Sequence, residues 1–288
     1  MEIGIGLPNT VSGTTGRQIT AFAQAAEEAG FSTLGTIDRI VYPNYEPLVA
    51  LSAAAAVTER IRLATTVMLG PLRGNPTMVA KQALSLDALA GGGRVVLGIA
   101  IGAREDDYEI SGVAMSERGT WLDDALPRIR RIWNGEGEIE PGIGPRPEGG
   151  GPSLIVGGHA DVSIERAARH GDGWIFGGGR PEQFGELAEK LTSAWERHGR
   201  GGEPHTMALA YFSLGDAAEE AARRNLGDYY AFLGEEMAGM LVGSAATDAD
   251  TVRAYLSGFE QAGADELVLF PSSSDPGQVG LLAEAAGL

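Results

Sequence analysis

Residues 61–101 read IRLATTVMLGPLRGNPTMVAKQALSLDALAGGGRVVLGIAI, and this stretch decides the predicted fold. Apolar runs rich in β-branched residues stand at its two ends, at 61–69 and 94–101. Between them, Asn75 and Pro76 are typical of a helix start, and the glycines at 91–93 are typical of a helix end. The stretch therefore predicts a strand–helix–strand unit. Its near-continuous apolar strands favour a parallel sheet covered by helices.

The same alternation continues on both sides of this unit. The eight predicted strands are 3–7, 33–37, 61–69, 94–101, 154–156, 174–176, 207–214 and 266–270. Helical spacing is found at 18–29, 78–90, 122–133, 162–170, 181–197, 248–262 and 278–286. An α/β fold that alternates eight times at this length predicts a (β/α)8 TIM barrel with insertions. A doubly wound open sheet remains the alternative.

Two gaps between predicted strands are about twice as long as the others. In residues 135–152, 11 of 18 residues are Gly or Pro, which excludes a regular helix and predicts a surface loop or lid. A linker is the other reading, but barrel strands resume directly afterwards. Residues 215–265 contain two or more predicted helices and the aromatic stretch at 228–232, which fits a helical insertion over the barrel mouth. We expect a single domain over 1–288.

Composition excludes several classes of function. The chain has no cysteine, which removes disulfide scaffolds, thiolate metal sites and cysteine nucleophiles. Its 22 basic and 39 acidic residues give a net charge of −17, which argues against nucleic acid or an anionic membrane surface as partner. No apolar run approaches the roughly 18 residues of a membrane span. The first residues, MEIGIGLPNT, lack a signal-peptide pattern, so the expected location is the cytoplasm.

Glycine-rich loops at two strand ends predict a phosphate site. Gly157 and Gly158 follow the fifth strand, and glycines 177–179 followed by Arg180 end the sixth. Bare backbone allows close approach of a ligand, and each loop leads into a helix whose N-terminus favours an anion. The alternative is that these glycines only close turns, since the chain contains 43 of them.

Other strand ends carry charged and aromatic residues. Asp38 and Arg39 follow the second strand. They are either a functional buried pair at the barrel mouth or a structural feature in which the Asp caps the next turn. The acidic run at 105–107 is interpreted as a solvated loop or helix cap. No dinucleotide-binding motif, P-loop motif or GxSxG motif is present. The histidines form no paired motif either, so no metal site is predicted. Some aromatic residues are candidates either to line a pocket for a flat ligand or to pack in the core: Tyr42, Tyr45, Trp121, Trp174, Tyr211, Tyr229 and Phe232.

Several segments resemble one known family. They include IGIGLPN at 3–9, AEEAGFSTLGTIDR at 26–39, the stretch quoted above, GDGW at 171–174 and ADELVLFP at 264–271. With these motifs the chain resembles the bacterial luciferase-like family of flavin-dependent oxidoreductases, which includes FMN-dependent monooxygenases and coenzyme F420-dependent enzymes. The resemblance implies a barrel with insertions, commonly a dimer, that holds its cofactor at the carboxyl ends of the strands.

The resemblance also assigns roles to individual residues. It places the cofactor ring over strands two to four and the phosphate at the two glycine loops. The implied cofactor-binding residues are Thr66, Val67, Met68, Arg104, Gly157, Gly158 and Arg180, with Asp38 and Arg39 as the catalytic pair. In some relatives a non-proline cis peptide lies behind the ring, and its place here is within 66–68.

Arg39 is a departure from the family pattern. Many relatives have a histidine after the strand-two acid, and an arginine cannot act as a general base near neutral pH. Arg39 can still stabilise an anionic reduced flavin or orient a substrate carboxylate. His159 belongs to another strand end and is not expected to replace that histidine.

The first expected function is that of a monooxygenase. Reduced FMN from a separate flavin reductase and O2 would act on a small organic substrate, within a homodimer. The alternatives are F420-dependent hydride transfer without oxygen, and a cofactor-free barrel with a non-enzymatic binding role. The acidic chain leans toward FMN, because F420 has the more anionic tail.

Overall fold

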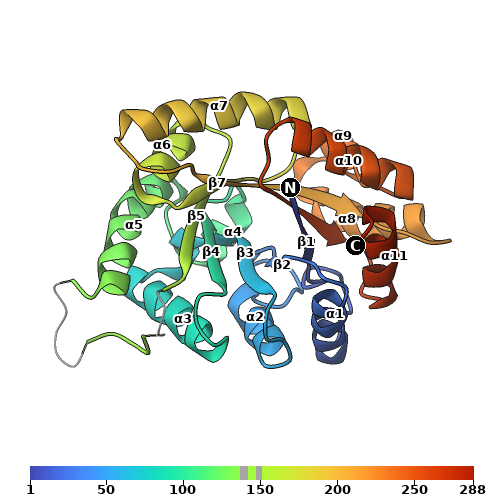
Figure 1. The fold of residues 1–288 in the computed structure, drawn as a ribbon, viewed down its shortest axis with the longest axis horizontal. Helices are drawn as coiled ribbons and strands as arrows, with labels where there is room; N and C mark the ends of the chain where they lie inside the picture. The colour runs from blue at the N-terminus through green and yellow to red at the C-terminus, as the bar shows by residue number, and fades with distance from the viewer. Residues whose placement is uncertain (137–141, 147–150) are drawn as a thin grey trace.

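A closed barrel of eight parallel strands forms the centre of the molecule (Figure 1). The computed structural model describes residues 1–136, 142–146 and 151–288. The strands are β1 (Glu2–Gly6), β2 (Thr33–Thr36), β3 (Arg62–Leu69), β4 (Val95–Ala100), β5 (Ser153–Gly157), β6 (Gly173–Phe176), β7 (His205–Phe212) and β8 (Glu266–Pro271). Each strand pairs with its neighbours in chain order, and β1 closes the ring against β8. The predicted (β/α)8 barrel is confirmed, and the open sheet was the wrong alternative.

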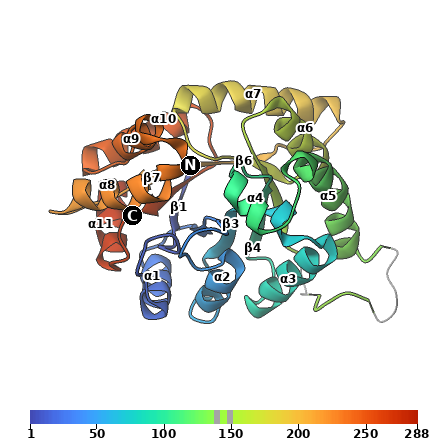
Figure 2. The ribbon, with the colours of Figure 1, turned by 180° about the vertical axis from the view of Figure 1, so that it is seen from behind.

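Helices surround the barrel on its outside (Figures 1 and 2). They are α1 (Gly16–Glu28), α2 (Pro47–Ala55), α3 (Pro76–Leu89), α4 (Glu105–Ile110), α5 (Arg118–Asn134), α6 (Asp161–His170), α7 (Pro181–Arg197), α8 (Ala218–Tyr229), α9 (Glu235–Gly243), α10 (Ala249–Gln261) and α11 (Gly277–Ala286). Asn75 caps α3 as predicted, because its side chain accepts a hydrogen bond from the Thr77 N–H. None of the helices in the described ranges is long and apolar enough to cross a membrane.

The two long gaps between strands have different outcomes. The segment between β7 and β8 contains α8, α9 and α10, so the predicted helical content at 215–265 is confirmed. The predicted loop at 135–152 falls largely on 137–141 and 147–150, which lie outside the described residues. Its described residues, 135–136, 142–146 and 151–152, belong to no helix or strand.

A β-bulge interrupts the pairing of β3 with β4. Thr65 pairs with Leu97 and Met68 pairs with Ile99, so two residues of β3 lie opposite Gly98 alone. The peptide bond between these two residues, Thr66 and Val67, is cis, where the family resemblance implied such a bond. Met68 returns to the buried core.

Glu266 connects three strands at the other end of the barrel. It starts β8, is 1% exposed, and receives a hydrogen bond from Ser32. Arg62 lies 3.1 Å and His205 3.5 Å from its carboxylate. Burial raises the pKa of Glu266, but the contacts from His205, Arg62 and Ser32 outweigh burial and lower the pKa from 4.5 to about 2.

This shift predicts how stability depends on pH. Because the pKa of Glu266 is lower in the folded chain, its stabilisation is present above pH 4.5 and is lost as pH falls from 4.5 toward 2. The loss amounts to about 3 kcal/mol. We expect the free energy of unfolding of Glu266→Gln, measured with urea, to change little between pH 4.5 and 2. The variant Glu203→Gln, at an exposed residue, should lose stability over this range as the wild type does. Parallel losses in wild type and Glu266→Gln would contradict the assignment.

Candidate active site

A cavity of about 530 Å³ opens at the carboxyl ends of the strands. Its walls come from the ends of β2 to β6, and residues at and just after the end of α8 close one side. Of the nine predicted site residues, seven line it: Asp38, Arg39, Thr66, Val67, Arg104, Gly157 and Gly158. Met68 is buried and does not line the cavity. Arg180 is exposed at the start of α7, outside the lining.

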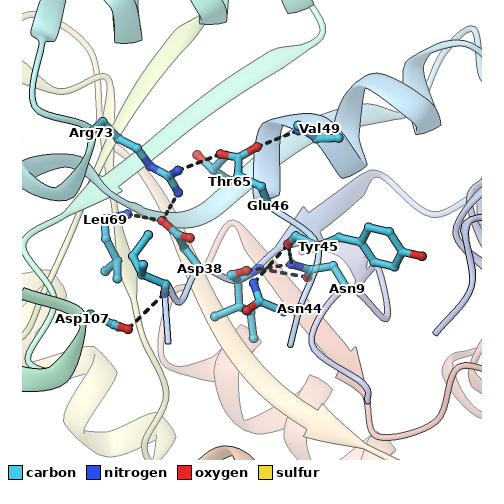
Figure 3. A network of polar contacts seen from close by, with 12 residues as sticks. Asn9, Asp38, Asn44, Tyr45, Glu46, Val49, Thr65, Leu69, Arg73 and Asp107 are labelled. Atoms are coloured by element: carbon cyan, nitrogen blue, oxygen red, sulfur yellow. Dashed lines mark hydrogen bonds and ion pairs between the residues drawn. The ribbon is translucent and has the colours of Figure 1, made fainter. Parts of the chain in front are cut away.

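Asp38 is held by an arginine that the sequence did not suggest. One carboxylate oxygen of Asp38, Oδ2, accepts hydrogen bonds from the Leu69 N–H at 2.8 Å and from the guanidinium of Arg73. Figure 3 shows Arg73 between Asp38 and Glu46, whose carboxylate lies 3.0 Å from Arg73. The other oxygen, Oδ1, is buried without a hydrogen-bond partner among the described residues. Asp38 and Arg39 are therefore both buried, but Asp38 pairs with Arg73 and not with Arg39.

Arg39 lies among aromatic rings. Its guanidinium donates to the carbonyls of Tyr229 and Val41, and it lies 4.3 Å from the ring centre of Tyr42 and 4.9 Å from that of Tyr229. Its Nε finds no acceptor within the described ranges. Burial lowers the pKa of Arg39, and the nearby charge of Arg104 lowers it further. Arginine nevertheless stays protonated at neutral pH, so the side chain acts as a buried cation.

Asp107 anchors the segment that carries Arg39. Its Oδ1 accepts from the backbone N–H groups of Ile40 at 3.1 Å and Val41 at 2.6 Å, and its side chain is fully buried. Arg104 lies between Asp107, 3.4 Å from its Oδ2, and the more exposed Asp106. The interpretation of this acidic run as a solvated loop was wrong for Asp107, because the start of α4 turns it inward against the β2 end.

The loop after β5 packs its glycine backbone closely against the start of α6. Gly158 has φ +136°, and a Cβ on it would lie 2.5 Å from the Ser163 hydroxyl oxygen. Trp174 fixes the loop by donating to the Gly158 carbonyl at 2.7 Å. Ser163, in the first turn of α6, also lines the cavity. Ser163 was not predicted from the sequence, although it stands two residues after Asp161, where the helix begins, and that position was a usable signal.

His159 lies in the same loop and lines the cavity. Its ring stacks on Phe176 with a 4.6 Å centroid separation. Burial lowers the pKa of His159, so the ring is neutral at pH 7. It is suited to accept or donate a hydrogen bond without adding charge.

Aromatic residues at and just after the end of α8 close the cavity on one side. Tyr229, Tyr230 and Phe232 line it, and the hydroxyl oxygens of Tyr230 and Tyr211 lie 2.5 Å apart. Burial raises the pKa of Tyr229 and Tyr230, so both hydroxyls remain protonated. Among the other predicted aromatics, Tyr42 contacts Arg39, and Trp174 belongs to the core. Tyr45 and Trp121 lie outside the lining.

A family model described as luciferase-like monooxygenase matches residues 1–266. An uncharacterised protein of Mycobacterium bovis is 34% identical over 225 residues, which cover 67% of this chain and 77% of that protein.

Two solved structures extend the comparison. The monooxygenase RslO1 from Streptomyces bottropensis superposes with TM-score 0.79 and 22% identity, over 99% of this chain and 98% of that one. An F420-dependent secondary alcohol dehydrogenase in complex with an F420–acetone adduct superposes with TM-score 0.82 and 19% identity, over 99% and 97%. At these identities, the likeness shows the fold alone.

Proposed function

This chain belongs to the luciferase-like monooxygenase family, and from that premise we propose that it is a monooxygenase that uses reduced FMN and O2 on a small organic substrate. The observation that carries the proposal is the cavity at the strand ends, which combines a glycine cradle at β5 with a bulged, arginine-lined wall at β3 and β4. Bound FMN would supply the electrons and the reaction with oxygen.

The residues of the cradle fit a phosphate. Gly157 and Gly158 leave the backbone bare, and Ser163 offers a hydroxyl in the first turn of α6. The N-terminus of α6 adds a partial positive charge. We assign the cofactor phosphate to this loop. Arg180, at the start of α7, would approach it from outside the cavity.

The residues around the bulge fit the ring of a flavin. Thr66 and Val67 would support it from β3 with Met68 buried behind them, and Arg104 would face it from the β4 end. Asp38 Oδ1, buried and without a described partner, would accept a hydrogen bond from a ring N–H. Arg39 would stabilise negative charge beside the ring. We propose Asp38 and Arg39 as the catalytic residues, in one domain of 1–288 that works as a homodimer with a separate flavin reductase.

The charge of the cavity favours a second candidate, F420-dependent hydride transfer. In the described part of the chain, three arginines and one aspartate line the cavity, although the whole chain carries a net charge of −17. F420 is more anionic than FMN, and a basic lining would suit it.

One experiment separates the two candidates. The purified protein is titrated with FMN and with F420, and the reduced complexes are mixed with oxygenated buffer in a stopped-flow spectrometer. Tighter binding of FMN, with substrate-dependent oxygen consumption, is the expected result. Much tighter binding of F420, with no oxygen consumption, would establish the second candidate in its place.

The phosphate assignment predicts a selective loss of affinity. In Gly158→Ala, the new methyl group meets Ser163 and fills the cradle, so FMN should bind tenfold more weakly or worse, while riboflavin, which lacks the phosphate, keeps its affinity. Arg180→Ala should weaken FMN binding with an unchanged far-UV spectrum. Gly201→Ala, where a Cβ meets no atom within 4 Å, is the control. Unchanged FMN affinity in the first two variants would refute the assignment.

A further inference from the structure

Positive charge gathers in the cavity of an acidic protein. Arg39, Arg104 and Arg118 line the cavity, and among the described residues Asp38 is the one carboxylate in its lining. That carboxylate is already paired with Arg73, which is not among the lining residues. Burying a guanidinium away from water is costly unless an anion or other acceptors compensate. The cavity is therefore prepared for a negatively charged ligand.

All three arginines have an N–H group left over among the described residues, and two of them are nearly buried. Arg39 is 9% exposed and Arg104 8% exposed. Arg39 Nε and Arg104 Nη1 have no hydrogen-bond partner among the residues that the structure describes. Arg104 is also paired with Asp106 and Asp107, whereas no ion pair of Arg39 is found in the described ranges. Arg39 is thus a nearly buried cation for which no counter-ion is found among the described residues.

Aromatic faces surround these two guanidinium groups. The ring centre of Phe232 lies 3.9 Å from the guanidinium carbon of Arg104 and 5.6 Å from that of Arg39. Tyr229 lies beside Arg39 and also lines the cavity. A flat apolar body can pack on such rings while its charged end meets the arginines.

We propose that the substrate is a small aromatic or unsaturated carboxylic acid whose carboxylate is bound by Arg39 Nε and Arg104 Nη1. The inference rests on the proposed function, because it assigns the substrate class of that same site. Two single N–H donors from separate side chains fit the two oxygens of a carboxylate. The cofactor phosphate is assigned to the loop after β5. Arg39, at the end of β2, is therefore not needed for that phosphate and is placed to bind the substrate. The effect of burial and of Arg104, which both lower the pKa of Arg39, agrees with a site that gains from an anion.

Wild-type protein provides the first test. Benzoate and its neutral analogue benzamide are titrated by calorimetry into the protein alone and into the protein loaded with oxidised FMN. We expect benzoate to bind at least tenfold more tightly than benzamide. Equal affinities, or no binding of either probe, would overturn the proposal. Because the titration without FMN needs no flavin, failure of the proposed function is distinguishable from failure of this inference.

Variants of Arg39 provide the second test. Arg39→Gln should lower benzoate affinity to that of benzamide, and Arg39→Lys should keep part of the preference because it keeps the charge. Arg17→Gln, at an exposed arginine of α1, is the matched control and should bind like wild type. Undiminished benzoate binding by Arg39→Gln would overturn the proposal. If Arg39→Gln loses its far-UV spectrum, Arg39→Lys and the wild-type comparison decide.

A third measurement identifies which anion Arg39 holds. The ratio of FMN to riboflavin affinity reports contacts to the cofactor phosphate. We expect Arg39→Gln to leave this ratio unchanged. A fall of the ratio to one would mean that Arg39 binds the cofactor phosphate and not a substrate carboxylate.

Discussion

Gly98→Ala is expected to destabilise the barrel by more than about 3 kcal/mol, the upper range for overpacking a core. A Cβ at Gly98 would lie 2.0 Å from the Thr65 carbonyl oxygen. That atom belongs to the backbone of β3 and cannot turn away as a flexible side chain would. Gly98 also faces the two bulged residues, so the methyl group would push β3 from β4 where Thr66 and Val67 enter the cavity.

Urea unfolding followed by far-UV circular dichroism measures this effect. The control is Gly239→Ala in α9, where an added Cβ meets no atom within 4 Å. Replacing Gly by Ala in a helix interior raises stability by about 0.5–1 kcal/mol. Two glycine-to-alanine changes should therefore move the midpoint in opposite directions. A wild-type midpoint in Gly98→Ala would mean that β3 and β4 are not as close as described.

Arg73→Met is expected to lower the free energy of unfolding by about 3–5 kcal/mol, which is typical when one partner of a buried ion pair is removed. The Asp38 side chain is 1% exposed and Arg73 15% exposed, so the remaining carboxylate would stay buried without its cation. Arg73 also contacts Glu46, which caps α2 by accepting from the Val49 N–H at 2.8 Å. Removing the guanidinium should therefore destabilise both Asp38 and the start of α2. We also expect it to weaken the binding of FMN.

A double-mutant cycle isolates the pair. Asp38→Asn removes the charge and keeps the shape, so Asp38→Asn combined with Arg73→Met should be more stable than Arg73→Met alone. The exposed Arg17→Met is the control for loss of an arginine elsewhere. The two readouts are urea unfolding and FMN titration. Strictly additive stability losses would show that Asp38 and Arg73 do not interact.

Most strands were predictable because apolar residues predominate in them, as in VVLGIA of β4 and LVLF of β8. A parallel strand inside a ring of helices is buried on both faces, so its sequence differs from the helices on either side. The helix α2 was missed for the same reason. Its sequence, PLVALSAAA, is apolar without a helical period, because most of its residues are buried. Where burial is nearly complete, periodicity no longer separates helix from strand.

The site was predictable only in part. Strand ends identify residues that face the cavity, and seven of the nine predicted residues line it. Partners between different strands were not predictable, since Arg73 is 35 residues from Asp38 in the sequence. The burial of Asp107 depends on how α4 packs, whereas its neighbours Glu105 and Asp106 gave it the appearance of a surface residue.

The cavity is built from two parts of the chain that the strand pairing of the barrel constrains differently. Its floor comes from the strand ends, where a change such as Gly98→Ala disturbs the barrel itself. The side formed by Tyr229, Tyr230 and Phe232 comes from the segment between β7 and β8, outside the closed ring of strands. Substitutions in that segment can reshape the entrance while the barrel keeps its pairing. Directed evolution of substrate preference should therefore begin at 229–232 and leave the strand ends unchanged.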